Sequence, residues 1–149
     1  MNPFILPDRE RLAAWKTFRT SLPALSEAEQ LRAVAAFWAQ APVGTYAYDA
    51  DNCAGWPTPW EMIADGSWCR NSTAIGMEFT LRLSGWDPAR LRLHFIRDLD
   101  LSEEMLVLVV DGTRWLNYEY REVVPVPETK QVLLFSCCHD GKSYVACGN

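Results

Sequence analysis

The residues of this chain that could do chemistry are its cysteines and histidines, and Cys69 has the most suggestive setting. It lies in the stretch GSWCR, directly before a segment with helical character. A thiol at the N-terminus of a helix faces the positive end of the helix dipole, which stabilises the thiolate, and Arg70 acts in the same direction. Acyl transfer by a cysteine also needs a base within hydrogen-bonding reach and a group that orients this base. Cys69 is therefore a candidate nucleophile, or else a buried thiol that packs as a small apolar side chain.

The two histidines are the candidate bases. His94 lies in the predicted strand LRLHFIR, on the face that it shares with Arg92 and Ile96, where a partly exposed histidine is unremarkable. His139 directly precedes a predicted Asp-Gly turn, where polar residues are common for reasons of turn geometry. We therefore consider either histidine as a base only if Cys69 proves to be active.

The remaining cysteines show no pattern of a metal site. Cys137, Cys138 and His139 are adjacent, and adjacent residues on a strand point to opposite faces, so they lack a ligand spacing such as Cys-x-x-Cys. We expect no metal and no cofactor. Because the chain has an odd number of cysteines and is large enough to fold without disulfides, Cys53 and Cys147 are expected to be unpaired thiols.

Composition excludes several functional classes. The 149 residues are 49% hydrophobic and carry a net charge of −5, with scattered basic residues, so we expect one soluble domain over residues 1–149 that does not bind nucleic acid. No apolar run approaches the roughly 20 residues of a membrane span, so no membrane contact is expected. The N-terminus lacks the basic and apolar regions of a secretory signal, which predicts that the protein stays in the cytoplasm in which it is made.

Two helices are predicted near the N-terminus. Asp8 can cap a helix that runs to about Ser21, and Ser26 with Glu29 forms a capping box for a second helix. We interpret residues 1–41 as a helical hairpin that packs on the rest of the chain. Its tryptophans at positions 15 and 38 could belong to the core or to an interface.

Two further helices flank the cysteine. The aperiodic stretch 42–56 is predicted to be a loop, after which Thr58 and Glu61 form a capping box for a short helix to about Asp65. The stretch from Asn71 to Leu83 is predicted to be a largely buried helix, closed by a glycine at position 85.

Beyond residue 91 the hydrophobic period changes to that of strands. Two Asp-Gly pairs mark hairpin turns, and the stretch 106–110 is apolar on both faces, as in a central strand that is covered on each side. With helices first and an antiparallel sheet second, the predicted fold class is α+β. The predicted strands are residues 91–97, 104–110, 113–121, 131–138 and 142–147.

The order of these segments resembles the bacterial transglutaminase-like cysteine proteinases of the transglutaminase-like superfamily. The resemblance covers about residues 56–126, in the runs WPTPWEMIADGSWC, GWDPARLRLHFIRD, EEMLVLVVDG, TRWLNYEY and VVPVP. It implies a papain-like core over residues 56–149, in which a buried helix that begins near the cysteine packs on the antiparallel sheet.

Laid onto this chain, the catalytic residues of the family are retained only in part. The resemblance puts the cysteine on Cys69, the histidine position on Met105 and the aspartate position on Asn117. A thioether does not accept a proton at physiological pH, so Met105 cannot activate a thiol, and without an imidazolium there is no charge for an aspartate to stabilise. The resemblance therefore predicts a degenerate site.

Two classes of function follow. The first is a non-catalytic domain; residues 56–61 and the compact size look most similar to small members encoded by tailed bacteriophages, which implies a structural protein of the virion, such as a neck, tail or baseplate component. Its partners would then be other protein subunits, and it would pass from the host cytoplasm into the particle. The alternative is an active cysteine peptidase or acyltransferase that uses Cys69 with His94 or His139 recruited as base. An adaptor unrelated to phages is a third possibility.

Overall fold

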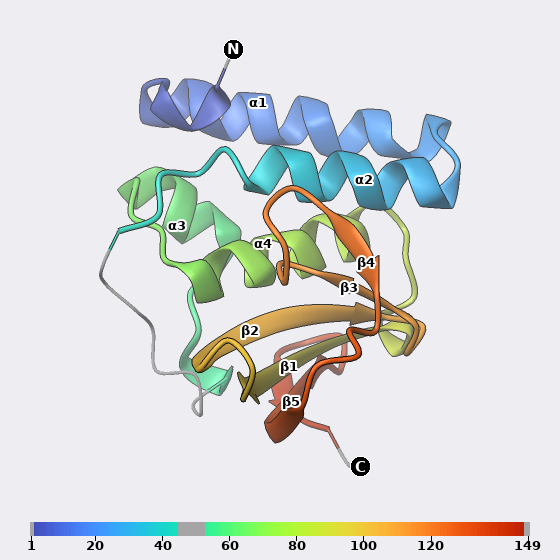
Figure 1. Ribbon diagram of the computed structural model, residues 1–149. Helices are drawn as coiled ribbons and strands as arrows, with labels where there is room; N and C mark the ends of the chain where they lie inside the picture. The colour runs from blue at the N-terminus through green and yellow to red at the C-terminus, as the bar shows by residue number, and fades with distance from the viewer. Residues whose placement is uncertain (1, 45–52, 148–149) are drawn as a thin grey trace.

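The computed structural model describes residues 2–44 and 53–147, in which four α-helices lie over one face of a six-stranded antiparallel sheet (Figure 1). This arrangement confirms the predicted α+β class. The loop expected over residues 42–56 lies in part outside the described residues. The helices are α1 (Asp8–Ser21), α2 (Glu27–Trp38), α3 (Pro59–Asp65) and α4 (Arg70–Leu83), with short 3-10 turns η1 (Pro3–Ile5), η2 (Leu22–Ala24), η3 (Cys53–Gly55) and η4 (Pro88–Arg90).

Capping boxes start two of these helices as predicted. At α2, the Ser26 hydroxyl accepts from the main-chain N–H of Glu29 while the Glu29 carboxylate accepts from the N–H of Ser26. The same reciprocal pair, Thr58 and Glu61, starts α3. The prediction that Asp8 caps α1 was wrong. Asp8 is the first helical residue. Pro7 takes the cap position, where its extended backbone lets its carbonyl accept from the N–H of Arg11 over 2.9 Å without a side-chain contact.

A tight turn connects α3 to α4. Gly66 ends α3 in the left-handed conformation, with a φ of 74°, and its N–H donates to the carbonyl of Met62 over 2.9 Å. Four residues later α4 begins at Arg70, one residue earlier than predicted, with Cys69 in the N-cap position. The cysteine therefore lies at the start of α4, as the sequence predicted.

The sheet has the strand order β4-β3-β2-β1-β5-β6. Its central strands pair in register from Leu91 opposite Val110 to Asp98 opposite Glu103. Both faces of β2 are buried from Met105 to Val110, as the apolar run predicted. The strands are β1 (Leu91–Asp98), β2 (Glu103–Val110), β3 (Arg114–Leu116), β4 (Val123–Pro125), β5 (Gln131–His139) and β6 (Tyr144–Ala146).

The strand predicted over residues 113–121 is much shorter than expected. Pairing with β2 stops at Leu116, because Asn117 takes a left-handed conformation with a φ of 70° and turns the chain out of the strand. The alternation of apolar and polar residues continues past this point, so the pattern carried no sign of the break. The chain then returns as β4, which pairs with β3.

Helix α4 is the centre of the molecule, since it lies between the α1–α2 pair and the sheet (Figure 1). The Thr80 hydroxyl on this helix accepts from the indole N–H groups of Trp15 and Trp38, over 3.0 and 2.9 Å. Both tryptophans are fully buried and therefore belong to the core. One hydrophobic cluster joins residues of the N-terminal hairpin to α4 and the sheet. The division of the domain into a hairpin over residues 1–41 and a core over residues 56–149 stays a prediction.

The sheet face turned away from the helices has a smaller cluster of its own, formed by Ile96, Met105, Val107, Val109 and Trp115. Tyr118 and Val124 pack against it. Among the described helices, none combines the length and apolar character needed to cross a membrane.

Candidate functional site

The N-terminus of α4 presents Cys69 from a protected position. Its side chain is buried, with 2% of the residue exposed. The hydroxyl of Ser72 accepts from the main-chain N–H of Cys69 over 2.7 Å and donates to the Cys69 carbonyl over 2.8 Å. These two bonds hold the first turn of the helix, and they fix the backbone of Cys69 against it.

Arg70 connects Cys69's helix start to the two strands that follow. Its Nη2 lies 3.5 Å from the sulfur of Met105 and donates to the carbonyl of Tyr118 over 3.2 Å. Its Nη1 forms a half-exposed ion pair with Glu103 over 2.9 Å. The Arg70 guanidinium therefore contacts Met105. Met105 is the residue that the resemblance places at the histidine position of the family.

Asn117, the residue after β3, belongs to the same site; we call the region of Cys69, Arg70, Met105 and Asn117 the corner. The Nδ2 of Asn117 donates to the carbonyls of Arg70 and Leu106, each over 2.9 Å, and its Oδ1 accepts from the hydroxyl of Thr73 over 3.0 Å. Two carbonyl oxygens need a donor between them, so this position is built for an amide. A carboxylate has no hydrogen to give at neutral pH and would face two acceptors.

The three positions singled out by the resemblance are thus brought together around one residue. Cys69 precedes Arg70 in the chain, the Arg70 guanidinium contacts Met105, and the Arg70 carbonyl accepts from Asn117. From the sequence, Arg70 was expected only to stabilise a thiolate at Cys69, and its contacts with both Met105 and Asn117 were not predicted. Its one available signal was a long cationic side chain directly after the helix cap.

His94 does not join this corner. It alternates with Leu93 and Phe95, which pack in the helix-side core, so it lies on the face turned away from the helices, which it shares with Ile96 and Met105. There it stands between Val107 of β2 and Ser136 of β5. Burial, with a smaller contribution from nearby Arg92, lowers the pKa of His94 below its ordinary value of 6.5.

His139 lies near the other end of α4. Its ring is 6.1 Å from that of Phe79 and 5.1 Å from that of Tyr144, measured between centroids. The ten residues from Cys69 to Phe79 correspond to roughly 15 Å of helix. Burial and the charge of Arg82 lower the pKa of His139, so it is largely neutral at physiological pH, but it is remote from the thiol.

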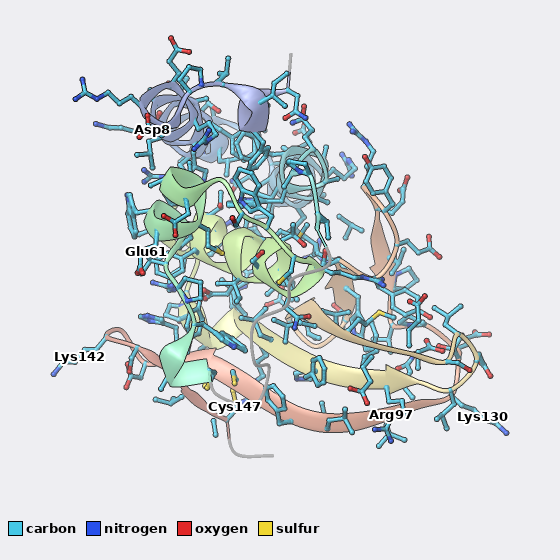
Figure 2. The ribbon with its side chains drawn as sticks, turned by 90° about the vertical axis from the view of Figure 1, so that its left-hand side faces the viewer. Asp8, Glu61, Arg97, Lys130, Lys142 and Cys147 are labelled. Atoms are coloured by element: carbon cyan, nitrogen blue, oxygen red, sulfur yellow. The ribbon has the colours of Figure 1, made fainter. Side chains whose placement is uncertain are left out.

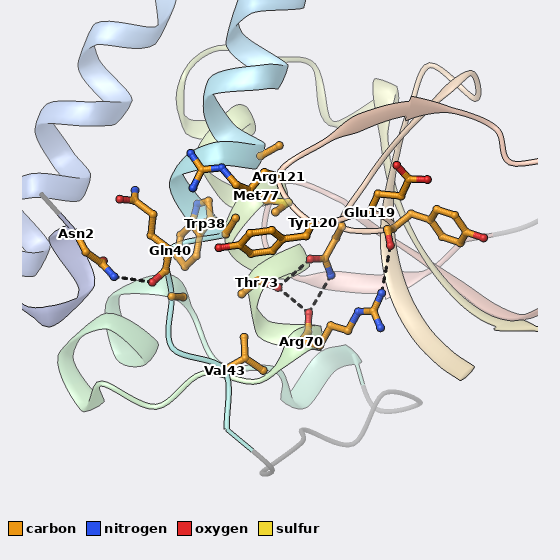
Figure 3. Close-up of a pocket in the computed structure, with 15 residues that line it drawn as sticks. Asn2, Trp38, Gln40, Val43, Arg70, Thr73, Met77, Glu119, Tyr120 and Arg121 are labelled. Atoms are coloured by element: carbon orange, nitrogen blue, oxygen red, sulfur yellow. Dashed lines mark hydrogen bonds between the residues drawn. The ribbon is translucent and has the colours of Figure 1, made fainter. Parts of the chain in front are cut away.

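A pocket of about 570 Å³ opens beside this corner, between α2, α4 and the segment after β3 (Figure 3). Arg70, Thr73 and Asn117 belong to both the pocket and the site, whereas Cys69 and Met105 do not line the pocket. The lining residues are Asn2, Ala35, Trp38, Ala39, Gln40, Ala41, Val43, Arg70, Thr73, Met77, Asn117, Tyr118, Glu119, Tyr120 and Arg121.

The other cysteines lie away from Cys69, on and around β5. All five cysteines are free thiols, and burial, together with the nearby thiols of Cys53 and Cys147, raises the pKa of Cys137 and of Cys138. Residues 2–44 and 53–147 contain no group of three histidine, cysteine or acidic side chains that could hold a metal ion.

Comparison with solved structures shows the same architecture in LapG of Legionella pneumophila, a transglutaminase-like cysteine protease domain. The match has a TM-score of 0.72 and 27% sequence identity, and it covers 87% of this chain and 73% of the LapG chain. The fold is papain-like, of the transglutaminase-like type.

Two further LapG structures with the transglutaminase-like fold agree. The EGTA-treated form matches with a TM-score of 0.71 at 27% identity over 87% of this chain and 73% of LapG. The calcium-bound form gives 0.74 at 24% identity over 95% of this chain and 80% of LapG. Protein-family models give no match to this sequence, and neither do curated proteins. The likeness supports the transglutaminase-like superfamily, while the correspondence of Met105 and Asn117 to its histidine and aspartate stays a prediction.

Proposed function

We propose that this chain is a non-catalytic transglutaminase-like domain that serves as a structural protein of a tailed-phage virion, in the neck, tail or baseplate. The non-catalytic part is carried by one observation, the engagement of Asn117 and Met105 in structural contacts with Arg70, the residue that follows Cys69. Asn117 donates to two main-chain carbonyls, and the Met105 sulfur lies against the Arg70 guanidinium. Neither side chain exchanges protons at neutral pH.

The missing element is a group that moves a proton. A cysteine hydrolase needs a base that takes the thiol proton and later returns it to the leaving group. Arg70 is the nearest charged group to Cys69 on this helix, and a guanidinium remains protonated throughout the physiological range. It can stabilise a negative charge at the helix start, but it cannot carry a proton from the thiol to a leaving group.

The pocket beside α4 is our candidate contact surface for a partner subunit. Tyr118, Tyr120 and two arginines, Arg70 and Arg121, are among its lining residues, and tyrosine and arginine are enriched where proteins meet. Tyr120 is 73% exposed, so its ring is available to a partner. The partner in this proposal is another protein of the particle, which a loop or chain end would join to this pocket.

The virion setting is supported by the resemblance of residues 56–61 to small phage-encoded members of the family, and by the compact chain. In this proposal the protein is present in the host cytoplasm before assembly and in the particle afterwards. The test is quantitative mass spectrometry of particles purified from the phage that encodes the chain. A constant copy number per particle is expected, and loss of the protein during purification would contradict the virion assignment.

An active cysteine peptidase or acyltransferase is the second candidate, favoured by the likeness to LapG and by the position of Cys69 at the start of α4. It requires His94 or His139 to reach the thiol, although one lies on the far face of the sheet and the other near Phe79. Incubation with a pool of peptides, followed by mass spectrometry, separates the candidates. Cleavage or acyl transfer that Cys69→Ala abolishes would establish the enzyme, and identical peptide pools for the two proteins would eliminate it.

A further inference from the structure

The outer side of β5 is unpaired along the first half of the strand. Strand β1 pairs with one side of β5, and β6 pairs with the other side only at residues 137–139. In the part of the chain that the structure describes, no strand pairs with the outer side of residues 131–135. Figure 2 shows β5 along the sheet margin farthest from α1, with Lys130 directly before it. We call residues 131–135 the free edge.

The main-chain groups that point outward from the free edge belong to Gln131 and Leu133. The N–H of Leu99 donates to the carbonyl of Lys130 over 2.8 Å, so Lys130 directs its main chain toward β1. The register with β1 continues without a break to residue 133. Because the main-chain direction alternates along a strand, Val132 also faces β1, and residues 131 and 133 face away from it.

Three consecutive apolar side chains lie on the free edge. Val132, Leu133 and Leu134 are 42%, 48% and 38% exposed. Leu133 lies opposite Ile96, which places it on the sheet face turned away from the helices, and Val132 lies on the other face. A helix or groove that packed on one face would cover only one of these groups. A further strand beside β5 would contact both.

The opposite margin of the sheet is protected in a way that the free edge is not. Strand β4 is three residues long, ends in Pro125 and contacts α2. Short edge strands, proline and covering helices are the usual means of preventing one sheet from pairing with another. Residues 131–135 contain neither proline nor a charged side chain. The free edge therefore has the properties of a strand that accepts another strand.

We propose that two copies of this chain pair through their free edges, with the two β5 strands antiparallel and Val132 of one copy opposite Val132 of the other. In this register Gln131 of each copy lies opposite Leu133 of the second copy, so the outward N–H and C=O groups of both residues gain partners. The two Val132 side chains face each other on one face of the joined sheet. The two Leu133 side chains are diagonal neighbours on the other face.

A second copy fits this edge because the pairing is the same on both sides of a two-fold axis. Each strand brings apolar side chains on both faces, and each needs an apolar partner on both faces. No charged residue lies within either free edge, so no like charges oppose each other. The two strands also end at the same limits, since each free edge is equally long.

Both limits of the free edge are set by hydrogen bonds. Before β5 the chain bends, and the Gln131 amide donates to the Thr129 hydroxyl over 2.6 Å. At the other end the Cys147 N–H donates to the carbonyl of Ser136 over 2.9 Å. So short a contact is smaller than a standard interface, and we expect a reversible dimer with a dissociation constant of about 100 μM. Neither Cys69 nor any residue of the pocket belongs to it, so the dimer is independent of the proposed function.

Sedimentation equilibrium of the full chain between about 10 and 1000 μM tests the dimer. We expect the apparent mass to rise with concentration from that of one chain toward that of two. Val132→Lys places two ammonium groups opposite each other and should keep the protein monomeric throughout. The matched control is Leu101→Lys, at a half-exposed leucine of the β1–β2 turn, which should dimerise like the unmodified protein. A constant monomer mass, or a dimer that Val132→Lys leaves intact, would overturn the proposal.

Cysteine substitutions test the register. Val132→Cys places two thiols in a pair that is not hydrogen-bonded, where the Cα atoms are close enough for a disulfide. Oxidation with copper phenanthroline should therefore give a covalent dimer on a non-reducing gel. Leu134→Cys is the control, because residue 134 lies opposite residue 130 and the two new thiols are too far apart to join. The unmodified protein gives the background from the native cysteines. Equal covalent dimer in the two variants, or more in Leu134→Cys, would overturn the proposed register.

Discussion

The side-chain amide of Asn117 donates to the main-chain carbonyl of Arg70 over 2.9 Å, and so joins the end of β3 to the first turn of α4. The same nitrogen donates to Leu106 of β2, also over 2.9 Å. The Asn117 amide therefore joins β3, α4 and β2 next to Cys69. An aspartate at position 117 would place its carboxylate against two acceptors, so replacing Asn117 by aspartate is expected to destabilise the folded protein.

Asn117→Ala should lower the free energy of unfolding by about 2–4 kcal/mol, because two partly buried carbonyls lose their donor and alanine is strained at a positive φ. Asn117→Asp should cost at least as much at neutral pH. Chemical denaturation measures both. The control is Asn71→Ala, because Asn71 is a half-buried residue of α4 whose side chain has no hydrogen bond to any other residue that the structure describes. A change within about 0.5 kcal/mol is expected. A stable Asn117→Asp variant would contradict this account of the corner.

Gly76→Ala should destabilise the protein by about 1–3 kcal/mol through overpacking, even though alanine is the better helix former. A Cβ at this position would lie 2.5 Å from the ring of Trp38, which is fully buried and held by Thr80. The thermal unfolding midpoint reports the effect. At Gly44 a Cβ meets only ordinary contact at 3.9 Å, so Gly44→Ala should leave the midpoint nearly unchanged.

Acid should destabilise the protein in part through Asp98. The Tyr118 hydroxyl donates to this carboxylate over 2.6 Å, and with bonds from Thr129 and two main-chain N–H groups it lowers the pKa of Asp98 below 3.8. A lowered pKa in the folded state means that the unfolded chain binds the proton more readily. This stabilisation is therefore present above pH 3.8 and is lost as the pH falls through the folded-state pKa.

Tyr118→Phe removes the largest cause of that shift, so the loss of stability between about pH 4 and pH 2 should be smaller than in the unmodified protein. Urea denaturation across this range measures the difference. Tyr120→Phe is the control, because Tyr120 is 73% exposed and the substitution should not change the acid dependence. Equal acid dependence for Tyr118→Phe and the unmodified protein would show that Asp98 is not held in this way.

The sequence predicted the helices well where capping residues mark their starts. Ser26 and Thr58 form the expected capping boxes, and α4 begins within one residue of its predicted start. Asp8 failed as a cap because the proline before it already supplies extended backbone. Local signals were sufficient where the stabilising contact is itself local.

Contacts between distant segments escaped the sequence. The apolar alternation ran past Leu116, yet Asn117 leaves the strand in order to bond to α4 and β2. The resemblance pointed to Asn117 and Met105, whereas nothing in the pattern indicated that Arg70 would contact one and accept from the other. These bonds join residues more than 30 positions apart, so no local rule describes them.

The central claim is that Cys69 has no catalytic partner, and the rate of its alkylation tests this most directly. The protein is treated with iodoacetamide at neutral pH, and the modification of Cys69 is followed by peptide mapping beside a model thiol peptide, with His94→Ala and His139→Ala as controls. We predict that Cys69 reacts no faster than the model thiol and equally slowly in both variants. A faster reaction that either histidine substitution suppresses would contradict the account.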